Sequence, residues 1–194
     1  MPFKVIITRD FDQMSEVAAA IAIQRIRERL REKASCILGL ATGNSPTGLY
    51  KHLAKAVNSG NIDAARIRTF NLDEYIGLPG ENAQQRALHP EGYSFFMIQE
   101  LFGLLQRKFG ATYVPWGTLV DQERLAAELA DHPEDWSEQG EDRGRAIVIR
   151  ADARSDYLKW IRREILDAYR EKIEADGGID LHVIGVGGRG HVAF

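Results

Sequence analysis

The chain has little cysteine and no long apolar segment. Cys36 is the one cysteine among 194 residues, so no internal disulfide can form, and its apolar neighbours predict a buried thiol in a strand. No apolar run approaches the roughly 20 residues that a membrane helix needs. The first residues, Met-Pro-Phe-Lys-Val-Ile-Ile, show neither a long apolar stretch nor a cleavage site. We therefore expect no membrane partner and a reducing, cytoplasmic setting.

Positive charge is not in excess either. The sequence has 25 Lys and Arg against 28 Asp and Glu, for a formal net charge of −3. No basic patch is present that would hold a polyanion, so nucleic acid is not an expected partner. The five histidines are scattered and no cysteine accompanies them, so no metal site is expected. His182 lies in an apolar run, which favours a core histidine over a functional one.

Short apolar runs alternate with longer segments of helical periodicity. The apolar runs predict strands over residues 3–8, 36–41, 66–71, 112–115, 146–150 and 180–186. The periodic segments predict helices over residues 12–33, 47–58, 91–107, 122–130 and 155–175. Residues 132–145 are acidic and polar, which predicts a surface loop. The alternation predicts an α/β fold with a mostly parallel sheet and helices on both faces, as one domain over residues 1–194.

The first segment with chemical potential is Leu-Gly-Leu-Ala-Thr-Gly-Asn-Ser-Pro-Thr-Gly-Leu, residues 38–49. Ser45 is predicted to cap the following helix, and Pro46 suits its first position. A phosphate could bind at the free N–H groups and hydroxyls of Thr42, Gly43, Asn44 and Ser45. The segment is not a P-loop, because a leucine stands where the lysine belongs. A plain capped turn between strand and helix is an equal alternative.

The second segment is Thr-Phe-Asn-Leu-Asp-Glu-Tyr-Ile-Gly-Leu-Pro, residues 69–79, which puts two carboxylates just past a strand. Ligands bind beyond the carboxyl ends of parallel strands, so Asp73 lies where a site is expected. Partial burial there would raise the pKa of its carboxyl and suit it to act as a general base. The alternative is an aspartate that only forms the turn before Gly-Leu-Pro.

The third segment is Gly-Val-Gly-Gly-Arg-Gly-His-Val-Ala-Phe, residues 185–194. Gly187, Gly188 and Arg189 form a candidate site loop after a strand, and His191 could move protons near neutral pH. The alternative for His191 is a histidine bonded to nearby backbone. The glycine pattern also matches a dinucleotide fingerprint, but that motif needs a following helix and a distant acidic residue. We expect a C-terminal portion beyond Phe194.

Together these three segments resemble the glucosamine-6-phosphate deaminase (isomerase) family, which is related to 6-phosphogluconolactonase. They occur in the order of the family, and the Asp-Glu-Tyr segment is the most specific of them. The resemblance implies a Rossmann-like fold and no cofactor. It also implies conversion of an amino-sugar 6-phosphate, glucosamine 6-phosphate, to fructose 6-phosphate and ammonia.

The resemblance also implies roles for individual residues. Residues 42–45 match the phosphate-contacting loop, Asp73 matches the base that moves a proton between C1 and C2, and His191 matches the histidine that assists ring opening. Arg189 is a departure, because the deaminases have an aspartate before this Gly-His pair. An arginine there cannot accept a hydrogen bond and would disfavour an imidazolium.

Three other functions remain open from the sequence. They are a 6-phosphogluconolactonase-like hydrolase that uses His191, a sugar-phosphate-binding paralogue without turnover, and a dinucleotide-binding protein. The Asp-Glu-Tyr segment argues against the first, and Arg189 favours the second. The expected partner is a small sugar phosphate, and the sequence leaves a homo-oligomer open.

Overall fold

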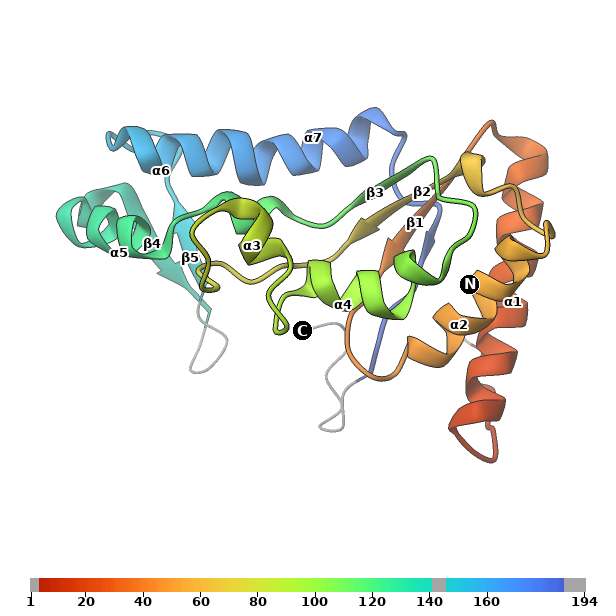
Figure 1. The fold of residues 1–194 in the computed structure, drawn as a ribbon. Coiled ribbons are helices and arrows are strands. Elements are labelled where there is room, and N and C mark those ends of the chain that lie inside the picture. Colours follow the sequence, from red (N-terminus) through yellow and green to blue (C-terminus); the bar gives the residue numbers. More distant parts are fainter. Residues whose placement is uncertain (1–3, 141–145, 187–194) are drawn as a thin grey trace. The chain divides into compact units, whose positions relative to one another are not determined.

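The computed structural model describes residues 4–140 and 146–186 (Figure 1). The chain divides into two compact units. The first unit comprises Met1–Leu72, Tyr93–Val114 and Gly178–Phe194, and the second comprises Asp73–Gly92 and Pro115–Gly177. Each unit has its own hydrophobic core. One domain over residues 1–194 stays a prediction.

A four-stranded parallel sheet forms the framework of the first unit, with strand order β3-β2-β1-β6 (Figure 1). The strands are β1 (Cys36–Leu40), β2 (Ile67–Asn71), β3 (Ala111–Tyr113) and β6 (Leu181–His182). The helices of this unit are α1 (Phe11–Glu32), α2 (Thr47–Asn58) and α4 (Tyr93–Glu100). Two 3-10 turns lie at Ala64–Arg66 and Phe102–Leu104. The predicted α/β fold built on a parallel sheet is confirmed.

Alternate positions of β1 point to opposite faces of the sheet, and one face carries the core. Cys36, Leu38 and Leu40 are at most 1% exposed and pack in one cluster with apolar side chains of α1, α2 and α4. Burial raises the pKa of the Cys36 thiol to about 11. The predicted buried cysteine is therefore confirmed.

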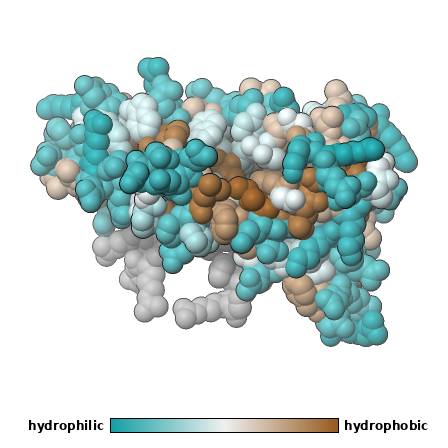
Figure 2. Space-filling model, viewed as in Figure 1, coloured by the Kyte–Doolittle hydropathy of each residue, from teal (hydrophilic) through white to brown (hydrophobic). Residues whose placement is uncertain are grey.

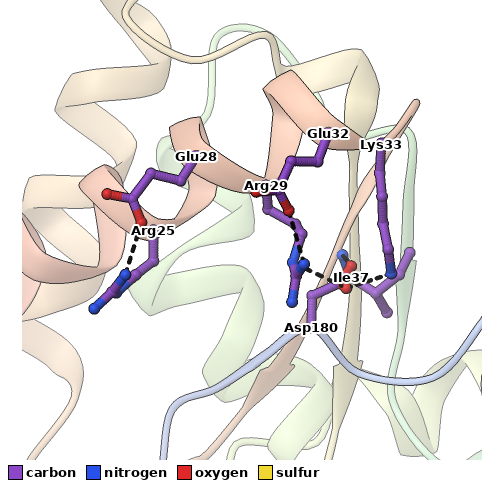
Figure 3. A network of polar contacts seen from close by, with 7 residues as sticks. All are labelled: Arg25, Glu28, Arg29, Glu32, Lys33, Ile37 and Asp180. Carbon is purple, nitrogen blue, oxygen red and sulfur yellow. Dashed lines mark hydrogen bonds and ion pairs between the residues drawn. The ribbon is translucent and has the colours of Figure 1, made fainter.

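A buried carboxylate ties the start of β6 to α1 and β1. The Asp180 side chain is 4% exposed, and it accepts hydrogen bonds from the Lys33 ammonium at 2.6 Å and from the Ile37 N–H at 3.0 Å. The Arg29 guanidinium lies 3.4 Å from the same carboxylate (Figure 3). Because Lys33 follows α1 and Ile37 lies in β1, one side chain joins the end of α1 and the start of β1 to β6, which is distant in sequence.

The second unit pairs a small antiparallel sheet with helices. Its strands are β4 (Trp136–Gln139) and β5 (Ala146–Ile149). Its helices are α3 (Ala83–Ala87), α5 (Gln122–Asp131), α6 (Asp156–Trp160) and α7 (Ala168–Ala175), and π-helical residues Ile161–Asp167 join the last two. Two 3-10 turns lie at Trp116–Leu119 and Pro133–Asp135. The core includes Val120, Ile149, Leu158 and Ile161.

Several element predictions are wrong in the first unit. Residues 4–8, within the predicted strand 3–8, are not in a strand, and Val5 and Ile7 are 69% and 92% exposed. An apolar run forms a strand only where a partner strand pairs with it. The predicted strand 180–186 shortens to Leu181–His182, because only these residues pair with β1. The predicted helix 91–107 ends at Glu100, and a 3-10 turn follows it.

The predicted acidic loop over residues 132–145 is also partly wrong. Residues Trp136–Gln139 form β4, which pairs antiparallel with β5, so the strand predicted over 146–150 belongs to a hairpin and not to the parallel sheet. Asp135 is buried, and its carboxylate accepts hydrogen bonds from the backbone N–H groups of Arg154 and Ser155. An acidic residue therefore acts as a local anchor in the core of this unit.

The surface of the described residues is mostly hydrophilic. Figure 2 shows a group of hydrophobic residues near the middle of the view, in the region of α4. In the first unit, Ile98 and Leu104 are each 41% exposed. Single exposed hydrophobic side chains such as these are ordinary on a protein surface. No helix among the described residues is long and apolar enough to cross a membrane.

Candidate functional site

Residues 42–45 leave the carboxyl end of β1 and lead into α2, in the first unit. Gly43 has φ +93°, and no atom lies within 4 Å of the place where its Cβ would be. Within the described part of the chain, the N–H groups of Gly43, Asn44 and Ser45 and the hydroxyls of Thr42 and Ser45 form no hydrogen bond. The loop therefore presents free donors at a helix N-terminus, which suits an anion.

The predicted cap of α2 is wrong. The helix begins at Thr47, Pro46 occupies the cap position, and no side chain caps the helix. Instead the Thr47 hydroxyl and N–H both donate to the Asn44 carbonyl, at 2.9 and 3.4 Å, and close a tight turn. Because this turn uses Thr47, the Ser45 hydroxyl is left available to a ligand.

Two buried side chains hold the backbone that precedes the loop. The Tyr50 phenol of α2 donates to the Ala41 carbonyl, and the Asn71 amide of β2 donates to the Leu40 carbonyl at 3.2 Å. The Leu72 N–H donates to the same Leu40 carbonyl at 3.3 Å. Burial raises the pKa of the Tyr50 phenol, so it stays a neutral donor. The loop thus begins from a fixed strand end.

The third sequence segment starts beside this loop. A Cβ on Gly185 would lie 2.8 Å from the Ser45 Oγ and 4.0 Å from the Thr42 carbonyl oxygen. Only glycine allows this close approach without displacing Ser45. The structure therefore brings Thr42, Ser45 and Gly185 together in the first unit.

Asp73 opens the second unit, directly after β2 and Leu72. Its side chain is half-buried and forms no hydrogen bond within the described residues. Burial, and then the neighbouring Glu74 carboxylate, raise the pKa of the Asp73 carboxyl. The Glu74 carboxylate accepts a hydrogen bond from the Tyr75 N–H at 2.9 Å. Asp73 is therefore the carboxyl of this pair that is suited to accept a proton.

The remaining candidates of the third segment, Gly187, Gly188, Arg189 and His191, lie outside the described residues. The 42–45 loop belongs to the first unit and Asp73 to the second, so each is placed within its own unit. No cluster of His, Cys, Asp and Glu able to hold a metal ion occurs in residues 4–140 and 146–186.

His182 lies in β6 but not in the core, so that prediction is wrong. The residue is exposed, and its ring lies over Gly39 of β1, where a Cβ would come within 2.3 Å of the imidazole. Its neighbours Leu181 and Val183 pack against the core instead. Alternation along the strand puts His182 on the other face of the sheet. Partial burial lowers the pKa of its imidazole.

No family model matches the chain. The chain is 33% identical over 191 residues to a glucosamine-6-phosphate deaminase of Thermoanaerobacter sp. (strain X514). The aligned region makes up 98% of this chain and 55% of that protein. The chain is 32% identical to the glucosamine-6-phosphate deaminase of Clostridium beijerinckii, and the aligned region makes up 98% of this chain and 58% of that protein. The chain is thus similar in sequence to glucosamine-6-phosphate deaminases. It spans little more than half the length of these curated relatives.

Solved structures give the same fold. A monomeric glucosamine-6-phosphate deaminase matches with a TM-score of 0.61 at 24% identity, over 99% of this chain and 58% of that one. The 6-phosphogluconolactonase of Thermotoga maritima matches with a TM-score of 0.57 at 16% identity, over 93% of this chain and 59% of that one. The predicted resemblance to glucosamine-6-phosphate deaminases is thus confirmed, and the likeness to the lactonase is one of fold.

Sequence patterns did not single out the residues that hold the 42–45 loop. In the sequence, Tyr50 fits the apolar periodicity of a predicted helix, and Asn71 is the last residue of a predicted strand. A usable signal was present for Tyr50, because a phenol among buried leucines and alanines must find an acceptor. The partner itself, a strand-end carbonyl nine residues earlier, follows only from the fold.

Proposed function

We propose that this chain acts on an amino-sugar phosphate as a glucosamine-6-phosphate deaminase, converting it to fructose 6-phosphate and ammonia. Two observations, each within its own unit, carry the proposal: a free-donor loop at residues 42–45 and a carboxyl of raised pKa at Asp73, each in a segment typical of this family. Sequence identity of 33% and 32% to two curated deaminases supports it.

Each residue has a role in this proposal. Thr42, Gly43, Asn44 and Ser45 bind the 6-phosphate through N–H groups and hydroxyls, and the positive end of α2 favours its charge. Gly185 lets the next strand end come close to this phosphate position. The anchored phosphate then fixes the position of the sugar carbons relative to the catalytic groups.

Asp73 acts as the base that moves a proton between C1 and C2 of the open-chain sugar. A carboxyl whose pKa is raised by burial is a stronger base than an exposed aspartate, and it still releases the proton in the next step. The amino group at C2 leaves as ammonia, and one water is consumed overall as the aldose becomes a ketose. His191 assists ring opening in this scheme, and Gly187, Gly188 and Arg189 stay candidates from the same sequence segment.

The test is ammonia release from glucosamine 6-phosphate by the chain and by two single variants. Asp73→Asn removes the base and keeps the shape, so the rate should fall by about 10²–10⁴-fold. Ser45→Ala removes one phosphate donor and should raise KM more than it lowers kcat. Unchanged ammonia release in Asp73→Asn would refute the role of Asp73.

Two further readouts separate the alternatives. Hydrolysis of 6-phosphogluconolactone without ammonia release would identify a lactonase-like activity. Binding of glucosamine 6-phosphate with no product would identify a sugar-phosphate-binding protein without turnover. Either result would replace the deaminase proposal.

A further inference from the structure

A groove of about 630 Å³ lies between α1 and the C-terminal end of α2, within the first unit. Ala20 and Ile23 of α1 and Ala56 of α2 provide apolar lining. The charged lining comes from Arg27, Glu28 and Arg31, all on α1. The groove therefore combines an apolar surface with charged groups from one helix.

The two arginines of the groove differ from the other arginines of α1 in their pairing. Arg27 donates to the Asn61 carbonyl at 3.3 Å, and within the described residues neither Arg27 nor Arg31 forms an ion pair. They are four positions apart on one helix, where like charges are neighbours and repel each other. Other arginines of α1 are paired: Arg25 with Glu28, and Arg29 with Glu32.

Glu28 offsets this charge only in part, because Arg31 acts on its carboxylate less strongly than Gln24 and Arg25 do. One of its carboxylate oxygens accepts from the Gln24 amide at 2.9 Å, and the other accepts from Arg25 at 2.8 Å (Figure 3). Arg25, its ion-pair partner, is not part of the groove lining. Two guanidinium groups against one carboxylate leave the groove lining with a net positive charge.

We propose that this groove binds a small phosphorylated metabolite, a phosphate monoester. Arg27 and Arg31 hold the phosphate, because guanidinium groups match phosphate oxygens in shape and charge. The apolar lining of Ala20, Ile23 and Ala56 covers the carbon skeleton.

This site is separate from the 42–45 loop. The loop precedes the first residue of α2, whereas the groove contacts Ala56 and Asn61 at the far end. A helix of 12 residues spans about 18 Å. The proposal does not depend on the proposed enzymatic function, and α2 is the one element that both sites share.

The experiment uses ¹⁵N-labelled chain titrated with inorganic phosphate and with glucose 6-phosphate, with glucose as the unphosphorylated control. Both phosphorylated probes should shift the amide signals of residues 24–31 and 56–61 in a saturable way, and glucose should not. Signals of residues 42–45 report the other site independently. Shifts at residues 42–45 alone would overturn the groove proposal while leaving the proposed function intact.

Variants test the two arginines. The double change R27Q/R31Q should weaken binding in the groove about a hundredfold, about tenfold for each charge-assisted hydrogen bond that is removed. The control R163Q/R170Q removes the same charge from two exposed arginines of the second unit, and should change affinity less than about twofold. Equal losses in both double variants, or none in R27Q/R31Q, would overturn the proposal. Both pairs are on the surface, and circular dichroism checks that each variant folds.

Discussion

The phenol of Tyr50 donates a hydrogen bond to the carbonyl of Ala41, one residue before the loop that we assign to phosphate. Tyr50 is fully buried, so no water replaces this donor when the hydroxyl is removed. Tyr50→Phe should lower the free energy of unfolding by about 1–3 kcal/mol, because a buried carbonyl loses its partner. Urea unfolding checks this, and an unchanged m-value would show that the denatured state is unaffected.

The same variant should also weaken phosphate binding, since the loop would start from a less fixed strand end. Titration with inorganic phosphate, followed at the amide signals of residues 42–45, measures this. A variant that loses stability but binds phosphate as before would limit Tyr50 to a role in folding.

Asp180 provides a second prediction, and Asp156 is its matched control. Each carboxylate lies 2.6 Å from a lysine ammonium, but the Asp180 side chain is 4% exposed and that of Asp156 is 95% exposed. Asp180→Asn weakens its buried contacts to Lys33 and Arg29, and should cost about 1–3 kcal/mol of unfolding free energy. Asp156→Asn should cause no measurable change, because solvent screens an exposed pair.

Thermal or urea unfolding of both variants tests the contrast. Similar losses from the two substitutions would mean that burial does not set the strength of these pairs. Since Asp180 leads directly into β6, Asp180→Asn should also broaden the amide signals of Leu181 and His182.

Local patterns predicted much of the first unit. The helix predicted over residues 47–58 agrees with α2 at both ends, because a Ser-Pro-Thr start and a Ser-Gly stop flank one clear apolar stripe. The strands of Cys36 and Ile67 were found from short apolar runs. The apolar periodicity of each of these elements is visible within its own short segment. The parallel sheet follows from the alternation of strands and helices.

The second unit was predicted less well because its hairpin is a nonlocal feature. Trp136 pairs with Ile149, and residues 137–145 are polar and charged. Polar composition predicted a loop there, whereas backbone pairing and the buried Asp135 decided the structure. At the candidate site, the segment containing Asp73 was identified from sequence, but its pKa and the anchors of the loop required the fold.

Gly39 and His182 form a third testable pair. A Cβ on Gly39 would lie 2.3 Å from the imidazole of His182, so Gly39→Ala must displace the ring or the β6 strand. We expect a loss of about 1–3 kcal/mol, typical of overpacking. His182→Ala removes the obstacle, so the double variant should recover much of this loss. A double-mutant cycle of unfolding free energies measures the coupling, and strictly additive effects would contradict the contact.

The last prediction concerns the pH dependence of the proposed deaminase activity. Asp73 must be deprotonated to act as a base, so kcat/KM should fall as the pH drops through its pKa. Burial and the Glu74 carboxylate both raise that pKa, so this fall should occur at a higher pH than for an ordinary aspartate. Glu74→Gln removes the like charge but not the burial. The acid limb of the profile should therefore move to lower pH and stay above the range of an exposed aspartate.

Glu81→Gln is the control, because Glu81 is an exposed carboxylate of the same unit. It should leave the acid limb where it is. Profiles of kcat/KM report the groups of the free enzyme, so the shift measures Asp73 before substrate binds. An acid limb that does not move in Glu74→Gln would mean that a group other than Asp73 controls it. A shift toward higher pH would contradict the sign of the interaction, since removing a neighbouring negative charge can only make the Asp73 carboxyl easier to ionise.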